Sequence, residues 1–185
     1  MKNLLIILIL SMTFVSCKKD KQTELPKSDF NLKSDFTELT NKMTELDTIK
    51  IWTNLSQCMY EGIEKLKITR KGDSLKIQPE FTESMFVGAE YTKTKPIKIS
   101  VNDTVWKFNS FLKRNLKRVN MDSLEYGRLQ ITLKKERINF MTNGLGDSAI
   151  FLIDYCNTMM NLIPESENHI YAGTEIIEEP ELTTE

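Results

Sequence analysis

The chain has 185 residues, and its 25 Lys and Arg against 26 Asp and Glu give a formal charge of −1 at neutral pH. This balance argues against a nucleic-acid partner, because proteins that bind nucleic acids concentrate positive charge on their surface. Hydrophobic residues make up 40% of the chain, enough for the core of one domain, and the seven glycines and five prolines argue against a low-complexity protein.

Residues 1–16 have the pattern of a secretory signal peptide. Lys2 gives the N-terminus a positive charge, and a mostly apolar stretch runs from Leu4 to Val15. As a helix this stretch would be about 18 Å long, which is too short to cross a membrane. Ser16, a small residue, stands just before the chain becomes polar, as in signals that are cleaved.

The segment Phe14-Val15-Ser16-Cys17 resembles the lipobox of bacterial lipoproteins. In that family the cysteine receives a diacylglyceryl thioether, the signal peptide is cut just before it, and the new amino group is acylated. The resemblance implies lipidation of Cys17 and a cell-envelope protein anchored in a membrane, which we predict to be the outer membrane, with the leaflet left open. The alternative is an ordinary secreted protein with a free cysteine near its N-terminus.

The part of the chain after the signal peptide divides into three predicted regions. Residues 17–33 are polar and are predicted to form the lipidated cysteine and its tether. Residues 34–173 have regular hydrophobic patterns and are predicted to form a single domain. Residues 174–185 are rich in glutamate and are predicted to be a solvated acidic tail.

Hydrophobic periodicity predicts both helices and strands in this domain. A spacing of three to four predicts helices over about 35–46, about 104–119 and 148–163. Alternation predicts strands over 48–55, a hairpin over 64–81 that turns at Lys71-Gly72-Asp73, and further strand pairs at 84–91 with 96–101 and at 126–135 with 137–143. The order predicts an α+β fold, with a mostly antiparallel sheet of about six or seven strands and two or three helices packed on one face.

The helix predicted over 104–119 carries the most suggestive surface in the sequence. On a helical wheel, one tryptophan and five cations share the arc opposite the apolar residues. These residues are Trp106, Lys107, Lys113, Arg114, Lys117 and Arg118. Such a face suits an anionic partner, namely lipid headgroups, an acidic glycan or an acidic protein patch. The alternative is an ordinary solvated helix face with Trp106 folded under the lysine stems.

The cysteines and the single histidine bound the possible chemistry. Once Cys17 is lipidated, Cys58 and Cys156 remain, and they form either one disulfide bridge or two buried thiols. The chain has no CxxC motif, and with His169 as the only histidine a His-based metal site is not expected. We therefore predict neither a metal nor a cofactor.

The segment Gly146-Asp147-Ser148-Ala149 is similar to the nucleophile motif of the SGNH hydrolases. That family takes its catalytic histidine from a downstream DxxH motif, and the position three residues before His169 is Ser166 rather than Asp. The same residues are explained by a helix start, with Asp147 or Ser148 as the N-cap. We accordingly predict no catalytic residue.

These observations favour a lipid-anchored protein of the cell envelope with a small, non-catalytic binding domain for a protein or a glycan. A small envelope hydrolase is one alternative. A toxin-immunity or inhibitor lipoprotein is the other, although no motif in the sequence supports it.

Overall fold

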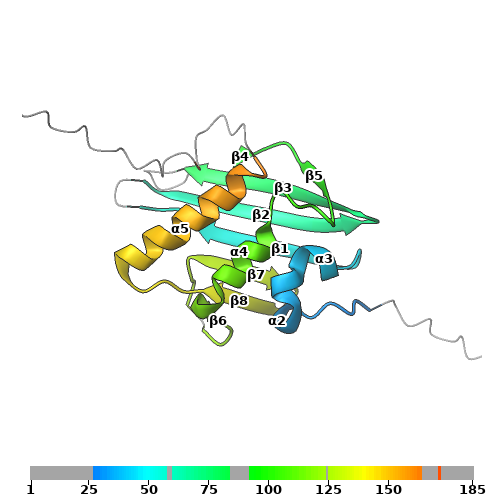
Figure 1. Ribbon diagram of the computed structural model, residues 1–185, viewed down its shortest axis with the longest axis horizontal. Coiled ribbons are helices and arrows are strands. Elements are labelled where there is room, and N and C mark those ends of the chain that lie inside the picture. The colour runs from blue at the N-terminus through cyan, green and yellow to red at the C-terminus, as the bar shows by residue number, and fades with distance from the viewer. Residues whose placement is uncertain (1–26, 58–59, 84–91, 124, 164–170, 172–185) are drawn as a thin grey trace, which may run out of the picture.

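The computed structural model describes residues 27–57, 60–83, 92–123, 125–163 and 171. They form an α+β fold in which helices cover one face of a single antiparallel sheet (Figure 1), as the sequence predicts. The strands lie in the order β4-β3-β2-β1-β7-β8-β6, and β5 pairs with β3 beside β4. In chain order the elements are α2 (Leu32–Asp35), the 3-10 turn η1 (Phe36–Glu38), α3 (Leu39–Lys42), β1 (Thr48–Asn54), β2 (Gly62–Lys71), β3 (Ser74–Glu83), β4 (Thr92–Lys93), β5 (Ile97–Ser100), α4 (Phe108–Arg114), the 3-10 turn η2 (Leu116–Arg118), β6 (Val119–Asn120), β7 (Leu129–Leu133), β8 (Glu136–Phe140) and α5 (Gly144–Met160).

The alternating segments become strands because each buries one side against the helices. In β1, Ile49 and Ile51 are buried while Lys50 between them is exposed. The predicted hairpin over 64–81 is confirmed as β2 and β3, which turn at Gly72, whose φ of +57° glycine adopts without strain. The predicted pair at 126–135 and 137–143 is confirmed as β7 and β8.

The predicted strand pair at 84–91 with 96–101 is only partly described by the structure. Residues 84–91 lie outside the described residues. Within 96–101 the strand β5 is present, and it pairs with β3 through Ile97 opposite Ile77. β1 lies between the two hairpins: it pairs with β2 on one side and with β7 on the other, where Ile51 lies opposite Ile131. The sheet therefore joins segments that are far apart in the chain.

The first helical segment starts earlier and is more broken than predicted. Residues 32–42 form α2, η1 and α3 instead of one helix over about 35–46. Phe30 and Leu32, which fall in the predicted tether, are buried in the core. The predicted boundary at residue 34 is therefore wrong, because the folded part already includes residue 30.

The predicted helix over 104–119 is also shorter, since α4 spans only Phe108–Arg114. The carboxylate of Asp103 accepts hydrogen bonds from the backbone N–H groups of Val105 (3.1 Å) and Trp106 (2.7 Å) and so forms a turn. Lys107 follows with a φ of +55°, which interrupts helical geometry immediately before α4. A helical wheel therefore does not apply to residues 104–107.

The last helix, α5, begins at Gly144 rather than at residue 148. Asn143 holds the N-cap position, so the prediction that Asp147 or Ser148 caps the helix is wrong. Asp147 lies in the first turn, where its carboxylate accepts a hydrogen bond from the N–H of Asn143 (3.0 Å). Phe151, Tyr155 and Met159 of α5 are buried against the sheet. No helix within the described residues is long and apolar enough to span a membrane.

Candidate functional site

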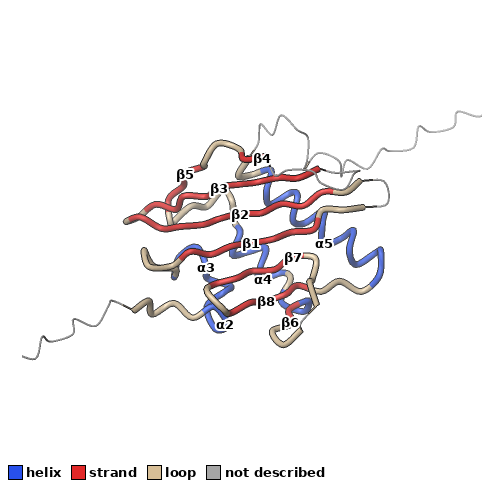
Figure 2. Tube along the Cα trace, turned by 180° about the vertical axis from the view of Figure 1, so that it is seen from behind, coloured by secondary structure: helices blue, strands red, loops and turns tan. Residues whose placement is uncertain are grey.

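The two faces of the sheet are covered differently. Seen from behind, the strands lie in front and the helices lie on the far side (Figure 2). Because side chains alternate along a strand, the positions between the buried ones point away from the helices. Among the described residues, no helix covers this side of β1, β2 and β7. We refer to it as the open face.

The register of the strands sorts the open face into rows that run across the sheet. One row contains Glu80, Lys65, Trp52, Gln130 and Asn139, from β3 to β8. The next row contains Gln78, Lys67, Lys50, Thr132 and Arg137. A third row contains Lys98, Lys76, Thr69 and Thr48, from β5 to β1. Lysine is the commonest residue type in these rows.

A groove of about 790 Å³ crosses the first two rows. Lys50 and Trp52 of β1 line it together with Lys65 and Lys67 of β2 and Tyr126 of the loop before β7. The ring centroids of Trp52 and Tyr126 are 5.6 Å apart, with the planes tilted by 58°. Tyr126 is 70% exposed, so its ring is open to a ligand. The groove therefore combines an aromatic corner with a line of cations.

The charges in this groove are unbalanced. Lys50 lies directly opposite Lys67 on the neighbouring strand, an arrangement that destabilises a sheet through like-charge repulsion. Neither lysine forms an ion pair with a carboxylate of the described residues. Among the described residues that line the groove, Glu80 is the one carboxylate, and it already pairs with Lys93 at 3.5 Å. An anion bound between Lys50 and Lys67 would relieve their repulsion.

The cationic face that the sequence predicts on 104–119 does not form. Trp106 is only 1% exposed; it stacks on Phe108 with ring centroids 4.6 Å apart and donates its indole N–H to the sulfur of Met159 at 3.4 Å. Arg118 is also buried, and its guanidinium pairs with Asp147 and lies 5.7 Å from the ring centroid of Phe151. Both side chains therefore belong to the interior.

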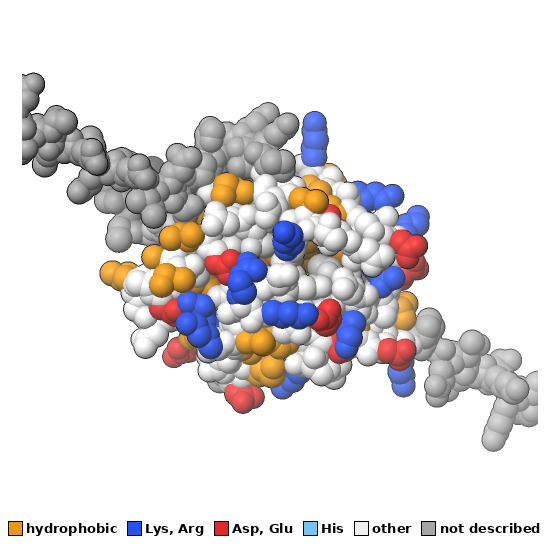
Figure 3. Space-filling view, in the orientation of Figure 1, with side chains coloured by type: hydrophobic (Ala, Val, Ile, Leu, Met, Phe, Trp, Pro, Cys, Tyr) orange, Lys and Arg blue, Asp and Glu red, His pale blue; other side chains and the backbone are white. Residues whose placement is uncertain are grey.

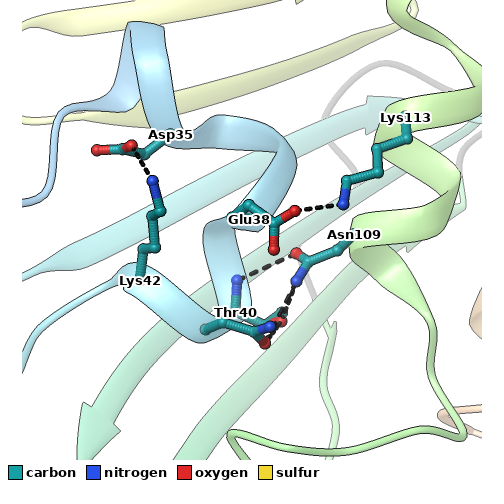
Figure 4. A network of polar contacts seen from close by, with 7 residues as sticks. Asp35, Glu38, Thr40, Lys42, Asn109 and Lys113 are labelled. Carbon is teal, nitrogen blue, oxygen red and sulfur yellow. Dashed lines mark hydrogen bonds and ion pairs between the residues drawn. The ribbon is translucent and has the colours of Figure 1, made fainter.

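The other cations of that predicted face mostly have partners. Figure 4 shows Lys113 of α4 pointing toward Glu38 of η1, with which it forms an ion pair. The amide of Asn109 bonds to Thr40 in the same network, with a distance of 2.7 Å to the Thr40 hydroxyl. Arg114 pairs with Asp154 at 2.6 Å. These contacts fasten α4 to its neighbours.

Lys107 and Lys117 are the two exposed residues of that predicted face that form no ion pair with a carboxylate of the described residues, and they lie at opposite ends of the segment. In the space-filling view of this side, basic and acidic side chains are interleaved (Figure 3). The helix-covered side is thus closer to charge balance than the open face.

The remaining predicted site residues have mixed outcomes. Cys156 is a buried free thiol whose burial, followed by the nearby Glu64, raises its pKa to about 12. Cys17, Cys58 and His169 lie outside the described residues, so lipidation and the Cys58–Cys156 bridge stay predictions. Ser148 is buried in the first turn of α5. No group of three or more His, Cys, Asp or Glu side chains in the described part of the chain could hold a metal ion.

Directly behind the groove lies a buried acid. Glu64 of β2 points into the core, where its two carboxyl oxygens accept hydrogen bonds from the hydroxyls of Tyr155 and Tyr171. Burial raises the pKa of Glu64 to about 7, although both tyrosine hydrogen bonds act in the opposite direction. The carboxyl is fully enclosed, so this cluster stabilises the fold and offers no access to a ligand.

The sequence analysis missed the open face, although its signal was present. Alternation around Ile49 and Ile51 puts Lys50 and Trp52 on the solvent side, and a tryptophan there is unusual for a solvated strand. Tyr126 and the neighbouring lysines join them only through the strand order, which single-strand patterns do not give.

The comparisons with known proteins identify no relative. No protein-family model, no curated protein and no solved structure matches the chain.

Proposed function

We propose that the protein is a lipid-anchored binding protein of the cell envelope and that its open face captures an acidic glycan. The observation that carries this proposal is the groove in which Trp52 and Tyr126 lie beside Lys50 and Lys67, which form no ion pair within the described part of the chain. The lipobox-like segment ending at Cys17 supports the anchor. No catalytic group is required for this role.

Each part of the groove suits one part of an acidic sugar. The rings of Trp52 and Tyr126 offer apolar surface to the C–H face of a pyranose. The ammonium groups of Lys50 and Lys67 offer charge-assisted hydrogen bonds to a carboxylate. Gln130 and Thr132 line the same groove and supply polar groups for hydroxyls.

A glycan fits this surface better than a protein does. Stable protein interfaces have a mainly apolar centre surrounded by a polar rim. In the groove, charged and polar side chains border the aromatic pair, namely Lys50, Lys65, Lys67, Glu80, Gln130 and Thr132. We therefore expect charge and hydrogen bonding to act together with contact between the rings and the sugar.

Tryptophan fluorescence tests the proposal directly, because the chain has two tryptophans and Trp106 is buried. Titrating the full-length protein with an oligogalacturonate should change the Trp52 signal, whereas a neutral malto-oligosaccharide of equal length should not. Binding should weaken as salt rises, since exposed charges are screened. Trp52→Ala should weaken binding of the acidic oligomer, as measured by calorimetry.

A charge-matched pair of variants provides the control. Lys50→Glu with Lys67→Glu should abolish binding while leaving two like charges opposite each other, so the stability of the sheet should change little. Lys33→Glu with Lys117→Glu makes the same charge change at exposed positions of the helical elements. Equal loss in both double variants, or equal binding of neutral and acidic oligomers, would show that the open face is not the site.

A further inference from the structure

The open face contains a second hollow, at the turn end of the β2–β3 hairpin. Its volume is about 680 Å³, and Lys76 of β3 and Lys98 of β5 are among its lining residues. These two lysines lie directly opposite each other across the strand pair, and both are exposed. Among the described residues, the open face thus has two lysine pairs across neighbouring strands, one in the groove and one in the second hollow.

The two lysine pairs lie close enough for one ligand to reach both. They are separated by two strand spacings across the sheet and two residues along it, which corresponds to roughly 12 Å between the pair centres. The polar side chains of Gln78 and Thr69 lie between them in the register. The path over the open face from Trp52 through both lysine pairs to Lys98, called the track from here on, measures roughly 20 Å.

Two carboxylates of the described residues lie near the track, and both are already engaged. Glu45 lines the second hollow and accepts a hydrogen bond from the backbone N–H of Gly72. Glu80 in the first groove pairs with Lys93. Lys76 and Lys98, like Lys50 and Lys67, form no ion pair with a carboxylate of the described residues. Within the described residues no carboxylate offsets the repulsion inside either pair, and an external anion bound there would do so.

We infer that the ligand is an extended acidic polysaccharide whose chain runs from the Trp52–Tyr126 corner across the Lys50–Lys67 pair to the Lys76–Lys98 pair. This inference rests on the proposed function and adds a second subsite to it. A repeating carboxylate along a sugar chain matches a repeating lysine pair along a sheet. A single acidic sugar would fill only the groove beside Lys50 and Lys67.

The experiment measures affinity against ligand length. Oligogalacturonates of increasing length, beginning with the monomer, are titrated into the full-length protein by calorimetry. Affinity should rise by at least about tenfold from short oligomers to those that reach both pairs, and then level off. Lys76→Glu with Lys98→Glu should remove this gain and leave the binding of short oligomers unchanged.

The outcomes separate this inference from the proposed function. If short oligomers bind but length brings no gain, or if the gain survives in the Lys76/Lys98 double variant, the second subsite is wrong and the first groove stands. If no oligomer binds, both proposals fail. If vesicles containing anionic lipid bind the protein as strongly as the long oligomer does, and lose binding in the Lys76/Lys98 variant, the track is a membrane-facing surface instead.

Discussion

Glu64 and Lys67 lie three residues apart on β2 and face opposite sides of the sheet. On the side of the helices, each carboxyl oxygen of Glu64 accepts a hydrogen bond from a buried hydroxyl, one from Tyr155 and one from Tyr171. On the open face, the ammonium group of Lys67 lies opposite Lys50 on the neighbouring strand and has no carboxylate partner among the described residues. A buried carboxyl group must be satisfied within the fold, whereas an exposed charge can remain available to a ligand.

The largest expected effect is the loss of stability when the buried Glu64 carboxyl is removed. Glu64→Ala leaves the two buried tyrosine hydroxyls without their partner and opens a cavity, which should lower the free energy of unfolding by about 3 to 4 kcal/mol near pH 5. Chemical denaturation measures this change. Lys67→Ala on the outer face should shift the same quantity by less than about 0.5 kcal/mol. Similar losses in the two variants would contradict the contrast.

The second expected effect is a pH dependence of the free energy of unfolding that comes from Glu64. Because the pKa of Glu64 is about 7 in the folded protein and 4.5 as the ordinary value, the folded state binds the proton more tightly than the unfolded state. Its contribution to stability is full below about pH 4.5, falls as the pH rises through 7, and amounts to about 3 kcal/mol in total. Tyr155 and Tyr171 stay protonated throughout, because their pKa values are raised well above 10.

Urea denaturation between about pH 5 and pH 8 checks this dependence. Glu64→Gln keeps an oxygen acceptor but cannot ionise, so the variant's free energy of unfolding should vary much less across this range. Parallel curves for the native chain and Glu64→Gln would assign the pH dependence to other groups.

The smallest expected effect is a gain in stability from a substitution on the open face. Lys67→Gln removes the repulsion with Lys50 and should raise the free energy of unfolding by about 0.5 kcal/mol at low salt. The gain should shrink as salt is added, because screening weakens the repulsion that it relieves. Thermal melts of Lys67→Gln and of the control Lys117→Gln, at low and high salt, measure it. A destabilised Lys67→Gln would mean that Lys67 has a structural role.

The fold follows well from the sequence where a strand has one buried side. The β2–β3 hairpin is readable because Leu66 and Ile68 alternate with lysines and Gly72 follows at the turn. The helix wheel over 104–119 failed for a local reason, since the Asp103 turn and the positive φ of Lys107 break the helical phase before Phe108. Trp106 therefore packs in the core instead of joining the lysines.

The candidate site needed information that single elements do not contain. Lys50, Lys67 and Lys76 each appear in the sequence as ordinary solvent-side residues of a strand. Their alignment into pairs depends on which strands are neighbours and on the register between them. That register is set by tertiary packing of segments more than a dozen residues apart, which local periodicity does not determine.

Tyr171 is the last residue of the buried Glu64 cluster to be synthesised. The chain emerges from its N-terminus onward, so Glu64 and Tyr155 are present before Tyr171 arrives. Until then one carboxyl oxygen lacks its donor and the ring is missing from its place 6.0 Å from Phe81. A chain ending before residue 171 would have every described strand of the sheet but would lack one hydroxyl donor to Glu64 and the aromatic ring beside Phe81, so we expect it to be less stable than the intact chain.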